Sequence, residues 1–348
     1  MWPFRKADPG AEILDFVYQK LQIDDEWSVR ESRSFTWWAH QLAQRIWIDG
    51  PVSEFGGQYY RIHAETEVVC DVSVTDRLHE ALAAMNANVT MSALVCDEAT
   101  GRVVFHCSAN FRRENRQAIA QAFFQAAAIQ AATAAAQAEP LAQILGGRVA
   151  DSAHPTSGAR WQPDDLLSIR EAVYLRVSEG LVSAPVGDFG RAFAADVRAI
   201  LETNPRPPGV LANGDAGGLT IEYQCVNDLT GAEAIFGPRR GIPGTALFQA
   251  FPDASHPELG RGVLTTLRVP IGIETELQNK ARAAQRLNAA EIAEPMDFHF
   301  LGSWCQHPSI GALSFVSFIP ASVYWPGLLG ALVWHLAARA RWVGDRLA

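Results

Sequence analysis

Cysteine and histidine stand close together near the C-terminus, in the sequence Cys305-Gln306-His307. A thiol beside an imidazole is the pairing that an activated nucleophile and its base require. Side chains two residues apart share a face only where a strand is regular, and Pro308 follows directly. We therefore expect a turn at this point and predict no catalytic residue there.

The stretch HPTSGAR, residues 154–160, is the most unusual polar segment of the chain. His154, Ser157 and Arg160 have the donors of an anion site or of a contact with a partner. The proline and glycine between them equally suit a rigid connector whose path they determine. We favour the connector and keep His154 and Arg160 as candidate partner contacts.

Two adjacent guanidinium groups, those of Arg239 and Arg240, lie in the glycine- and proline-rich segment GPRRGIPG. They suit pairing with carboxylates of a partner, and a solvated loop is the alternative. The glycine-rich run NGDAGG, residues 213–218, precedes a predicted strand, whereas a phosphate-binding loop precedes a helix. We expect a hairpin turn there.

Five separated cysteines without a C-x-x-C pair predict no metal site, and no motif predicts a cofactor.

Composition predicts a folded protein and excludes some partners. The chain has 348 residues, of which 48% are hydrophobic and 19% charged, as in globular proteins. A net charge of −9 argues against nucleic acid as a partner, because phosphate binding needs a basic face. The odd number of cysteines fits reduced thiols, and the N-terminal residues do not resemble a signal peptide. We expect a cytoplasmic protein.

The first half predicts a helix, strands, a helix, a hairpin and a long helix. Helices are expected from Asp8-Pro9 onward, at 35–49, at 75–86 and from 114 to about 138, where Pro140 ends or kinks the last one. The stretch 35–49 contains more tryptophan than one core face can easily take. Trp37 or Trp38 is therefore our candidate for an exposed anchor that contacts a partner.

The same order of elements returns in the second half, which predicts an internal duplication. Aligning the glycine pairs at 56–57 and 217–218, and the asparagines Asn86 and Asn288, leaves 41 additional residues in the second copy. We predict an α+β protein of two similar units related by a pseudo-twofold axis. Residues 1–149 form the first unit, 150–165 a linker and 166–348 the second unit, with an insert at about 226–262.

The uncharged stretch near the C-terminus is predicted to be a hairpin and a core helix. Prolines interrupt it, so that no helical run reaches the roughly 20 apolar residues that a bilayer core requires. Leucines and a valine at 329, 332, 333 and 336 have the spacing of one buried stripe. An interfacial helix is the alternative, because tryptophan and arginine flank the stripe.

The order of elements, with MNANVTMSALVCDEATGRVVFHCSANF and AFFQAAAIQAA in the first copy, resembles the YbjN-like family. That family shares its fold with the chaperones of type III secretion. The resemblance covers about 35–137 and, through the repeat, 189–341. It implies a unit that works as a dimer and holds a segment of a partner in surface grooves. Two copies in one chain are similar to a fused dimer, as in the substrate chaperones of mycobacterial type VII secretion.

These observations predict a non-catalytic chaperone or adaptor that binds a protein or peptide client, and the resemblance associates it with secretion. The chain is expected to act as a monomeric fused dimer or as a homodimer. One alternative is an enzyme whose site lies between the halves, uses Cys305, His307 or His154, and is covered by a loop at 237–262. The other is a peripheral membrane protein anchored by the C-terminal helix.

Overall fold

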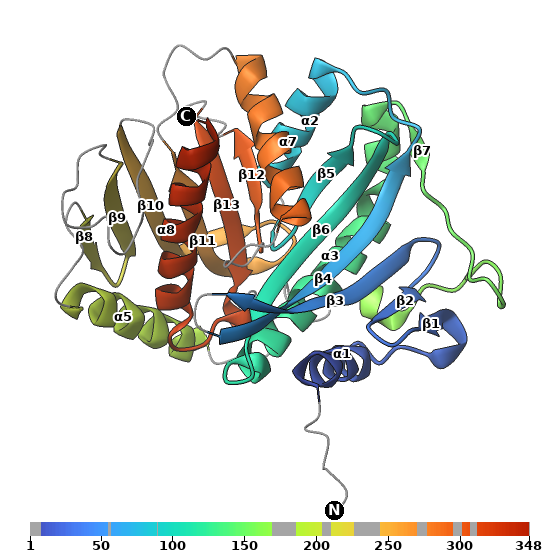
Figure 1. Ribbon diagram of the computed structural model, residues 1–348, viewed down its shortest axis with the longest axis horizontal. Coiled ribbons are helices and arrows are strands. Elements are labelled where there is room, and N and C mark those ends of the chain that lie inside the picture. The colour runs from blue at the N-terminus through green and yellow to red at the C-terminus, as the bar shows by residue number, and fades with distance from the viewer. Residues whose placement is uncertain are drawn as a thin grey trace, which may run out of the picture. The chain divides into compact units, whose positions relative to one another are not determined.

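The computed structural model describes residues 8–54, 57–88, 90–168, 186–203, 210–225, 244–269, 277–294, 301–306 and 312–347. The chain is an α+β protein with two antiparallel sheets of similar size (Figure 1). Each sheet belongs to one of two compact units. Unit 1 comprises 1–74, 91–170 and 292–301, and unit 2 comprises 75–90, 171–291 and 302–348. Each half of the sequence therefore contributes a short segment to the unit formed mainly by the other half, which the boundary predicted at 150–165 did not foresee.

Unit 1 contains the first sheet and its helices. Its strands are β1 (Ser28–Arg30), β2 (Ser34–Trp38), β3 (Ala43–Glu54), β4 (Gly57–Cys70), β5 (Ala93–Asp97), β6 (Arg102–Phe111) and β7 (Arg148–Val149). Its helices are α1 (Pro9–Lys20), η1 (Asp25–Trp27), α3 (Arg116–Leu145) and η2 (Asp165–Ser168). The strand order is β1-β2-β3-β4-β6-β5, and β7 pairs with the end of β4.

Unit 2 contains the second sheet, with strand order β12-β13-β11-β10-β9-β8. Its strands are β8 (Val210–Asp215), β9 (Gly218–Cys225), β10 (Gly244–His256), β11 (Gly260–Arg268), β12 (Ser303–Gln306) and β13 (Leu313–Pro320). Its helices are α2 (Asp76–Asn86), α5 (Val186–Glu202), α7 (Leu277–Ala293), η4 (Ala321–Val323) and α8 (Leu328–Leu347).

Helix α2 comes from the first half of the sequence but packs within unit 2. Asp76 at its start forms an ion pair with Arg282 of α7. At its end, the hydroxyl of Ser303 in β12 donates a hydrogen bond of 2.7 Å to the carbonyl oxygen of Asn86. These contacts account for the assignment of α2 to unit 2.

Apart from β7, the strands of the first sheet correspond in order to those of the second, as a duplication predicts. Six strands follow the same path in both, so that β4 corresponds to β11 and β3 to β10. From Ala43 to Gly244, and from Asp76 to Leu277, the separation is 201 residues in both cases. The alignment predicted from the glycine pairs was wrong, because it matched β4 with β9. Residues 244–262 are not part of an insert or lid but form β10 and the start of β11, and 226–243 lie outside the described residues.

The helix predicted at 35–49 is wrong, because this stretch forms β2 and β3. In β3 the buried side chains alternate, and Ile46 and Ile48 face the core, while in β2 the fully buried Phe35 and Trp37 are likewise two residues apart. A period of two is typical of a strand. Neither candidate anchor is exposed: Trp37 is 0% exposed and Trp38 6%. Trp37 lies beneath α3, where its indole donates to Gln44, which in turn donates to the Ala127 carbonyl. Trp38 lies against the segment that follows β7, where its indole donates to Ser152.

Several other predictions are confirmed. Asp8 caps α1 by accepting a hydrogen bond from the backbone N–H of Gly10, and the 91–111 hairpin is β5 and β6.

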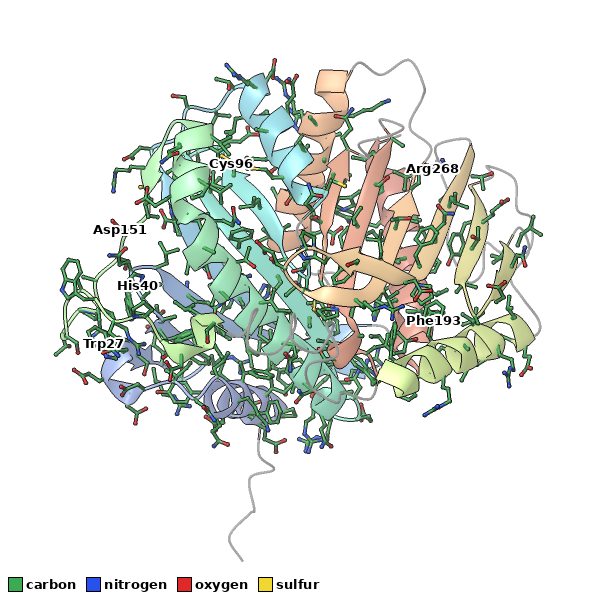
Figure 2. The ribbon with its side chains drawn as sticks, turned by 180° about the vertical axis from the view of Figure 1, so that it is seen from behind. Trp27, His40, Cys96, Asp151, Phe193 and Arg268 are labelled. Atoms are coloured by element: carbon green, nitrogen blue, oxygen red, sulfur yellow. The ribbon has the colours of Figure 1, made fainter. Side chains whose placement is uncertain are left out.

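Pro140 does not end the long helix, because α3 continues to Leu145 and ends at Gly146, whose φ of 73° suits glycine. Alanines on α3 let it pack closely across one face of sheet 1 (Figure 2).

The final helix has the predicted stripe. Leu329, Leu332 and Leu336 are buried, and Val333 is half-buried. Helices α8 and α5 pack against strands of sheet 2 (Figure 1). Among the described residues, no helix combines the length and the apolar character needed to cross a membrane.

Candidate functional site

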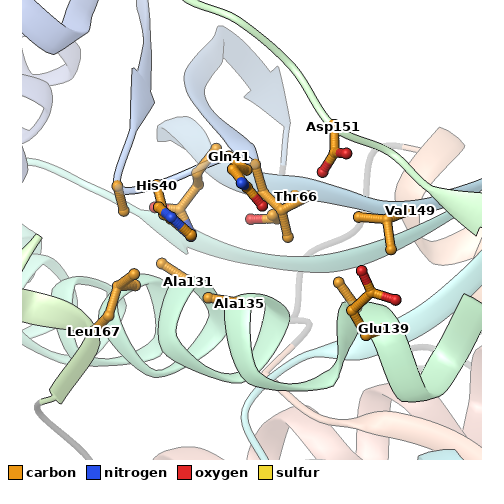
Figure 3. A pocket seen from close by; sticks show the side chains of 13 residues that line it. His40, Gln41, Thr66, Ala131, Ala135, Glu139, Val149, Asp151 and Leu167 are labelled. Atoms are coloured by element: carbon orange, nitrogen blue, oxygen red, sulfur yellow. The ribbon is translucent and has the colours of Figure 1, made fainter. Parts of the chain in front are cut away.

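Unit 1 contains an open pocket of about 230 Å³ between its sheet and α3 (Figure 3). The pocket lies where the β2–β3 turn, the middle of β4, the second half of α3 and the segment after β7 meet. The lining residues are Ala39, His40, Gln41, Leu42, Gln44, Thr66, Ala131, Ala135, Ala138, Glu139, Val149, Asp151 and Leu167.

The segment that follows β7 holds the β2–β3 turn in place. The backbone N–H of Ser152 donates to the carbonyl oxygen of Gln41 at 2.8 Å, and the indole of Trp38 donates to the Ser152 hydroxyl at 3.1 Å. Further along, the N–H of Asp164 donates to the carbonyl oxygen of Ala39 at 2.8 Å. Residues 151–164 therefore fix the pocket wall formed by 39–42.

Alanine side chains explain why there is space beside α3. Ala131, Ala135 and Ala138 line the pocket, and a methyl group fills less of the gap between helix and sheet than a larger side chain would. Figure 3 shows Ala131 and Ala135 on the side of α3 that faces Gln41 and Thr66. This wall offers a ligand an apolar surface.

Polar groups at the base of the pocket are already paired with one another. The Gln44 amide donates 2.9 Å hydrogen bonds to the Ala127 carbonyl and to the Gln130 side chain, and accepts one from Trp37 at 2.8 Å. Thr66 donates to the same Gln130 oxygen at 3.1 Å. Because these groups are satisfied, they shape the pocket and do not demand a ligand.

The rim of the pocket is acidic. Glu139 and Asp151 are exposed and lie at one end, on either side of Val149 (Figure 3). Within the ranges that the structure describes, neither carboxylate has a hydrogen bond or a salt bridge. No lysine or arginine is among the thirteen lining residues. The rim thus has negative charge available for a ligand.

His154 is buried and has a structural place in the connector. It exchanges backbone hydrogen bonds of 2.8 and 2.9 Å with Gly158, and its Nδ1 accepts one of 2.9 Å from the N–H of Ser157. Its ring packs edge-on against Trp38, with centroids 4.9 Å apart. The side chain is therefore not at the surface, where contact with a partner was expected.

Arg160 also holds the connector in place. Its guanidinium donates 2.7 Å to the carbonyl oxygen of Trp38 and pairs with Asp164 at 3.1 Å. The next residue, Trp161, is 78% exposed, in contrast to the buried Trp37 and Trp38. Trp161 belongs to neither a helix nor a strand, so no hydrophobic periodicity in the sequence could indicate whether its side chain is exposed.

The remaining predicted residues are either undescribed or buried. Arg239, Arg240 and His307 lie outside the described residues. Cys305 is fully buried, and burial raises the pKa of its thiol to about 12. A thiol that stays protonated is a poor nucleophile, so the structure gives no support to catalysis by Cys305.

Two buried histidines that sequence reasoning missed lie on the opposite face of sheet 1 from α3. His63 of β4 and His106 of β6 have ring nitrogens 3.3 Å apart. His63 Nε2 lies 3.0 Å from a carboxylate oxygen of Asp49, and His106 Nδ1 lies 3.5 Å from one of Glu65. Trp47 stacks on the His63 ring at 4.7 Å. The four ionisable groups form a chain with a carboxylate at each end.

Burial dominates the electrostatics of this histidine pair. It lowers the pKa of His63 to about 4 and also lowers the pKa of His106, so both rings are neutral near pH 7. The hydrogen bond with His63 lowers the pKa of Asp49. Burial raises the pKa of Glu65, but the hydrogen bond with His106 and nearby positive charges outweigh it and lower the pKa overall. The rings are too buried to reach a substrate.

No group of three or more histidine, cysteine or acidic side chains is arranged to hold a metal ion among the residues described. The histidine pair and its carboxylates follow a line and do not converge on one point.

Comparison with known proteins gives no relative: none of the family models, curated proteins or solved structures matches this chain. The class of protein is therefore described by its own fold and pocket. It is an α+β protein of two similar units, with an open, acid-rimmed pocket in unit 1.

Proposed function

We propose that the protein is a non-catalytic chaperone or adaptor that binds a polypeptide client in the pocket of unit 1. The observation that carries this proposal is the open pocket itself, with an apolar alanine wall, a satisfied floor and uncommitted carboxylates at its rim. Sites that recognise ligands combine apolar walls with a few polar groups in this way.

Exposed apolar side chains on the segments that form the pocket walls support a polypeptide over a small metabolite. Trp161 follows the connector that holds the pocket wall, and Ile144, one helical turn beyond Pro140 on α3, is 63% exposed. Tryptophan is enriched among the residues that dominate binding energy at protein interfaces. A client that extends beyond the pocket would cover such side chains.

The resemblance to the YbjN-like family and the secretion chaperones supports the same proposal, because those units hold segments of partners. The correspondence of the two sheets accords with a fused pair of units. The proposal includes a role in secretion. It also includes the working state of the protein, which is either a monomer acting as a fused dimer or a homodimer.

Site-specific crosslinking tests the proposal. A photoreactive phenylalanine analogue is placed at Gln41, which lines the pocket, and at Trp334, which is exposed on α8 of unit 2. We expect a polypeptide from the native cell to crosslink at Gln41 and not at Trp334. The crosslinked segment is then synthesised, and its binding to the purified protein is measured by calorimetry.

A pocket-filling variant provides the matched control. Ala135 and Ala136 are adjacent, exposed residues of α3, but only Ala135 lines the pocket. Ala135→Leu should weaken binding of the synthetic segment by about tenfold or more, because the added methyl groups occupy the site, whereas Ala136→Leu should not. Equal affinity in both variants, or crosslinking that does not favour Gln41, would reject the pocket as the client site.

A further inference from the structure

We propose that the pocket of unit 1 takes a positively charged side chain, that of an arginine or lysine of the client, with Glu139 and Asp151 pairing with its head. This inference names the chemistry of the ligand and rests on the proposed function. The carboxylates are on two different elements, α3 and the segment after β7, so a single cation entering between them contacts both sides of the rim.

Acidic residues close to the pocket in sequence are paired with cations, whereas the two rim carboxylates are not, among the residues described. Glu67 pairs with Arg102 at 2.5 Å, Asp71 with Arg148 at 2.5 Å and Asp164 with Arg160 at 3.1 Å. All three belong to segments that adjoin the pocket walls. Glu139 and Asp151 have no such cation within the described part of the chain. The missing positive charge is what a basic client residue would supply.

The alanine wall suits the stem of such a side chain. Arginine and lysine bury their methylene groups along apolar surface while the charged head stays near water. Ala131, Ala135 and Ala138 offer this surface, and the exposed carboxylates lie at one end of the pocket (Figure 3). A guanidinium has donors for two carboxylates at once, so we expect arginine to bind at least as well as lysine.

The test uses N-acetyl-arginine methylamide as a probe and the full chain with ¹³C-labelled alanine methyl groups. Titration followed by NMR should shift the methyl signals of Ala131, Ala135 and Ala138 in a saturable way, and should leave Ala136 unshifted. The citrulline analogue has the same shape without the charge. It should bind about three- to tenfold more weakly, as the loss of two exposed ion pairs would give.

Charge-removing variants complete the experiment. The double variant Glu139→Gln with Asp151→Asn should lose the same factor for the arginine probe and none for the citrulline analogue. Glu114→Gln, which neutralises an exposed carboxylate of unit 1 outside the pocket, is the control and should bind like the native chain. Equal binding of both probes, or an unchanged affinity in the double variant, overturns the inference.

The outcomes also separate this inference from the proposed function. If a polypeptide crosslinks at Gln41 and its segment binds the Glu139→Gln, Asp151→Asn variant as tightly as the native chain, the client site stands and the cationic side chain is rejected. If the arginine probe binds as expected but nothing crosslinks at Gln41, the pocket chemistry stands and the polypeptide client is rejected.

Discussion

Arg339 of α8 and Glu291 of α7 form a bidentate ion pair in the interior of unit 2, with N–O distances of 2.8 and 2.9 Å. The arginine side chain is 1% exposed and the glutamate 0%. The Trp304 indole donates to the same carboxylate at 2.5 Å, and the guanidinium lies 3.6 Å from the centre of the Phe315 ring. One charged pair thus connects two helices with β12 and β13.

Removing one partner of this pair should destabilise unit 2 strongly. Arg339→Met keeps the length of the side chain but leaves the Glu291 carboxylate buried without its cation. We expect a loss of about 3–5 kcal/mol in the free energy of unfolding, measured by urea denaturation. The double variant Arg339→Met with Glu291→Gln should recover part of that loss. If the two losses simply added, the pair would have no energetic coupling.

Arg339 also shows what local sequence patterns can and cannot predict. It continues the buried stripe of Leu329, Leu332 and Leu336 at helical spacing, although arginine was predicted at the flank of that stripe and not within it. Its partner was not predicted either, because Glu291 lies on a helix almost fifty residues earlier and no local rule joins them. Periodicity predicted the helix, whereas the pairing of Arg339 with Glu291 depends on tertiary contacts that periodicity does not report.

The pocket was missed for a related reason. The β2–β3 turn has the sequence Ala39-His40-Gln41-Leu42, with no glycine, proline, asparagine or aspartate to mark a turn. Long-range hydrogen bonds from 152 and 164 hold it instead. Because no residue type marks this turn, the sequence predicts one helix over 35–49. The turn at 39–42, which forms one wall of the pocket, was therefore not predicted. The hairpin at 91–111, marked by Gly101, was predicted correctly.

Asp196 of α5 should stabilise unit 2 by capping α8. Its carboxylate accepts hydrogen bonds from the backbone N–H of Gly327 at 2.7 Å and from the Tyr324 hydroxyl at 2.6 Å. Asp196→Ala should lower the free energy of unfolding by about 1–3 kcal/mol, because it leaves these donors unpaired and removes a negative charge from the helix start. Tyr324→Phe, which removes one of the bonds, should cost less. Thermal denaturation compares them, and equal losses would contradict the capping role.

Gln130 of α3 should be essential to the polar network beneath the pocket. It is fully buried, and its side chain pairs with those of Gln44 and Thr66 and with the Ala64 carbonyl. Gln130→Leu should cost about 2–3 kcal/mol of stability, because buried polar groups lose their partners. Gln121→Leu changes an exposed glutamine of the same helix and should have little effect. A similar loss in both variants would mean that the leucine itself, not the broken network, destabilises α3.

The buried His63 should make the stability of unit 1 depend on pH between about 6.5 and 4. Its pKa is about 4 in the folded protein against an ordinary 6.5, so the unfolded chain binds the proton more readily in this range. Its contribution is therefore complete above pH 6.5 and is lost as the pH falls toward 4, a loss of about 3 kcal/mol. His106, whose pKa burial also lowers, adds to the same trend.

His63→Gln removes the titrating group and should flatten this dependence. Urea denaturation between pH 7 and pH 4 would show the native chain losing about 3 kcal/mol more than the variant, whatever the substitution costs at pH 7. Arg45→Gln changes an exposed neighbour on β3 and leaves His63 in place, so it should keep most of the native slope. Parallel curves for native and His63→Gln proteins would show that the His63 ring is as easily protonated in the folded chain as in the unfolded one.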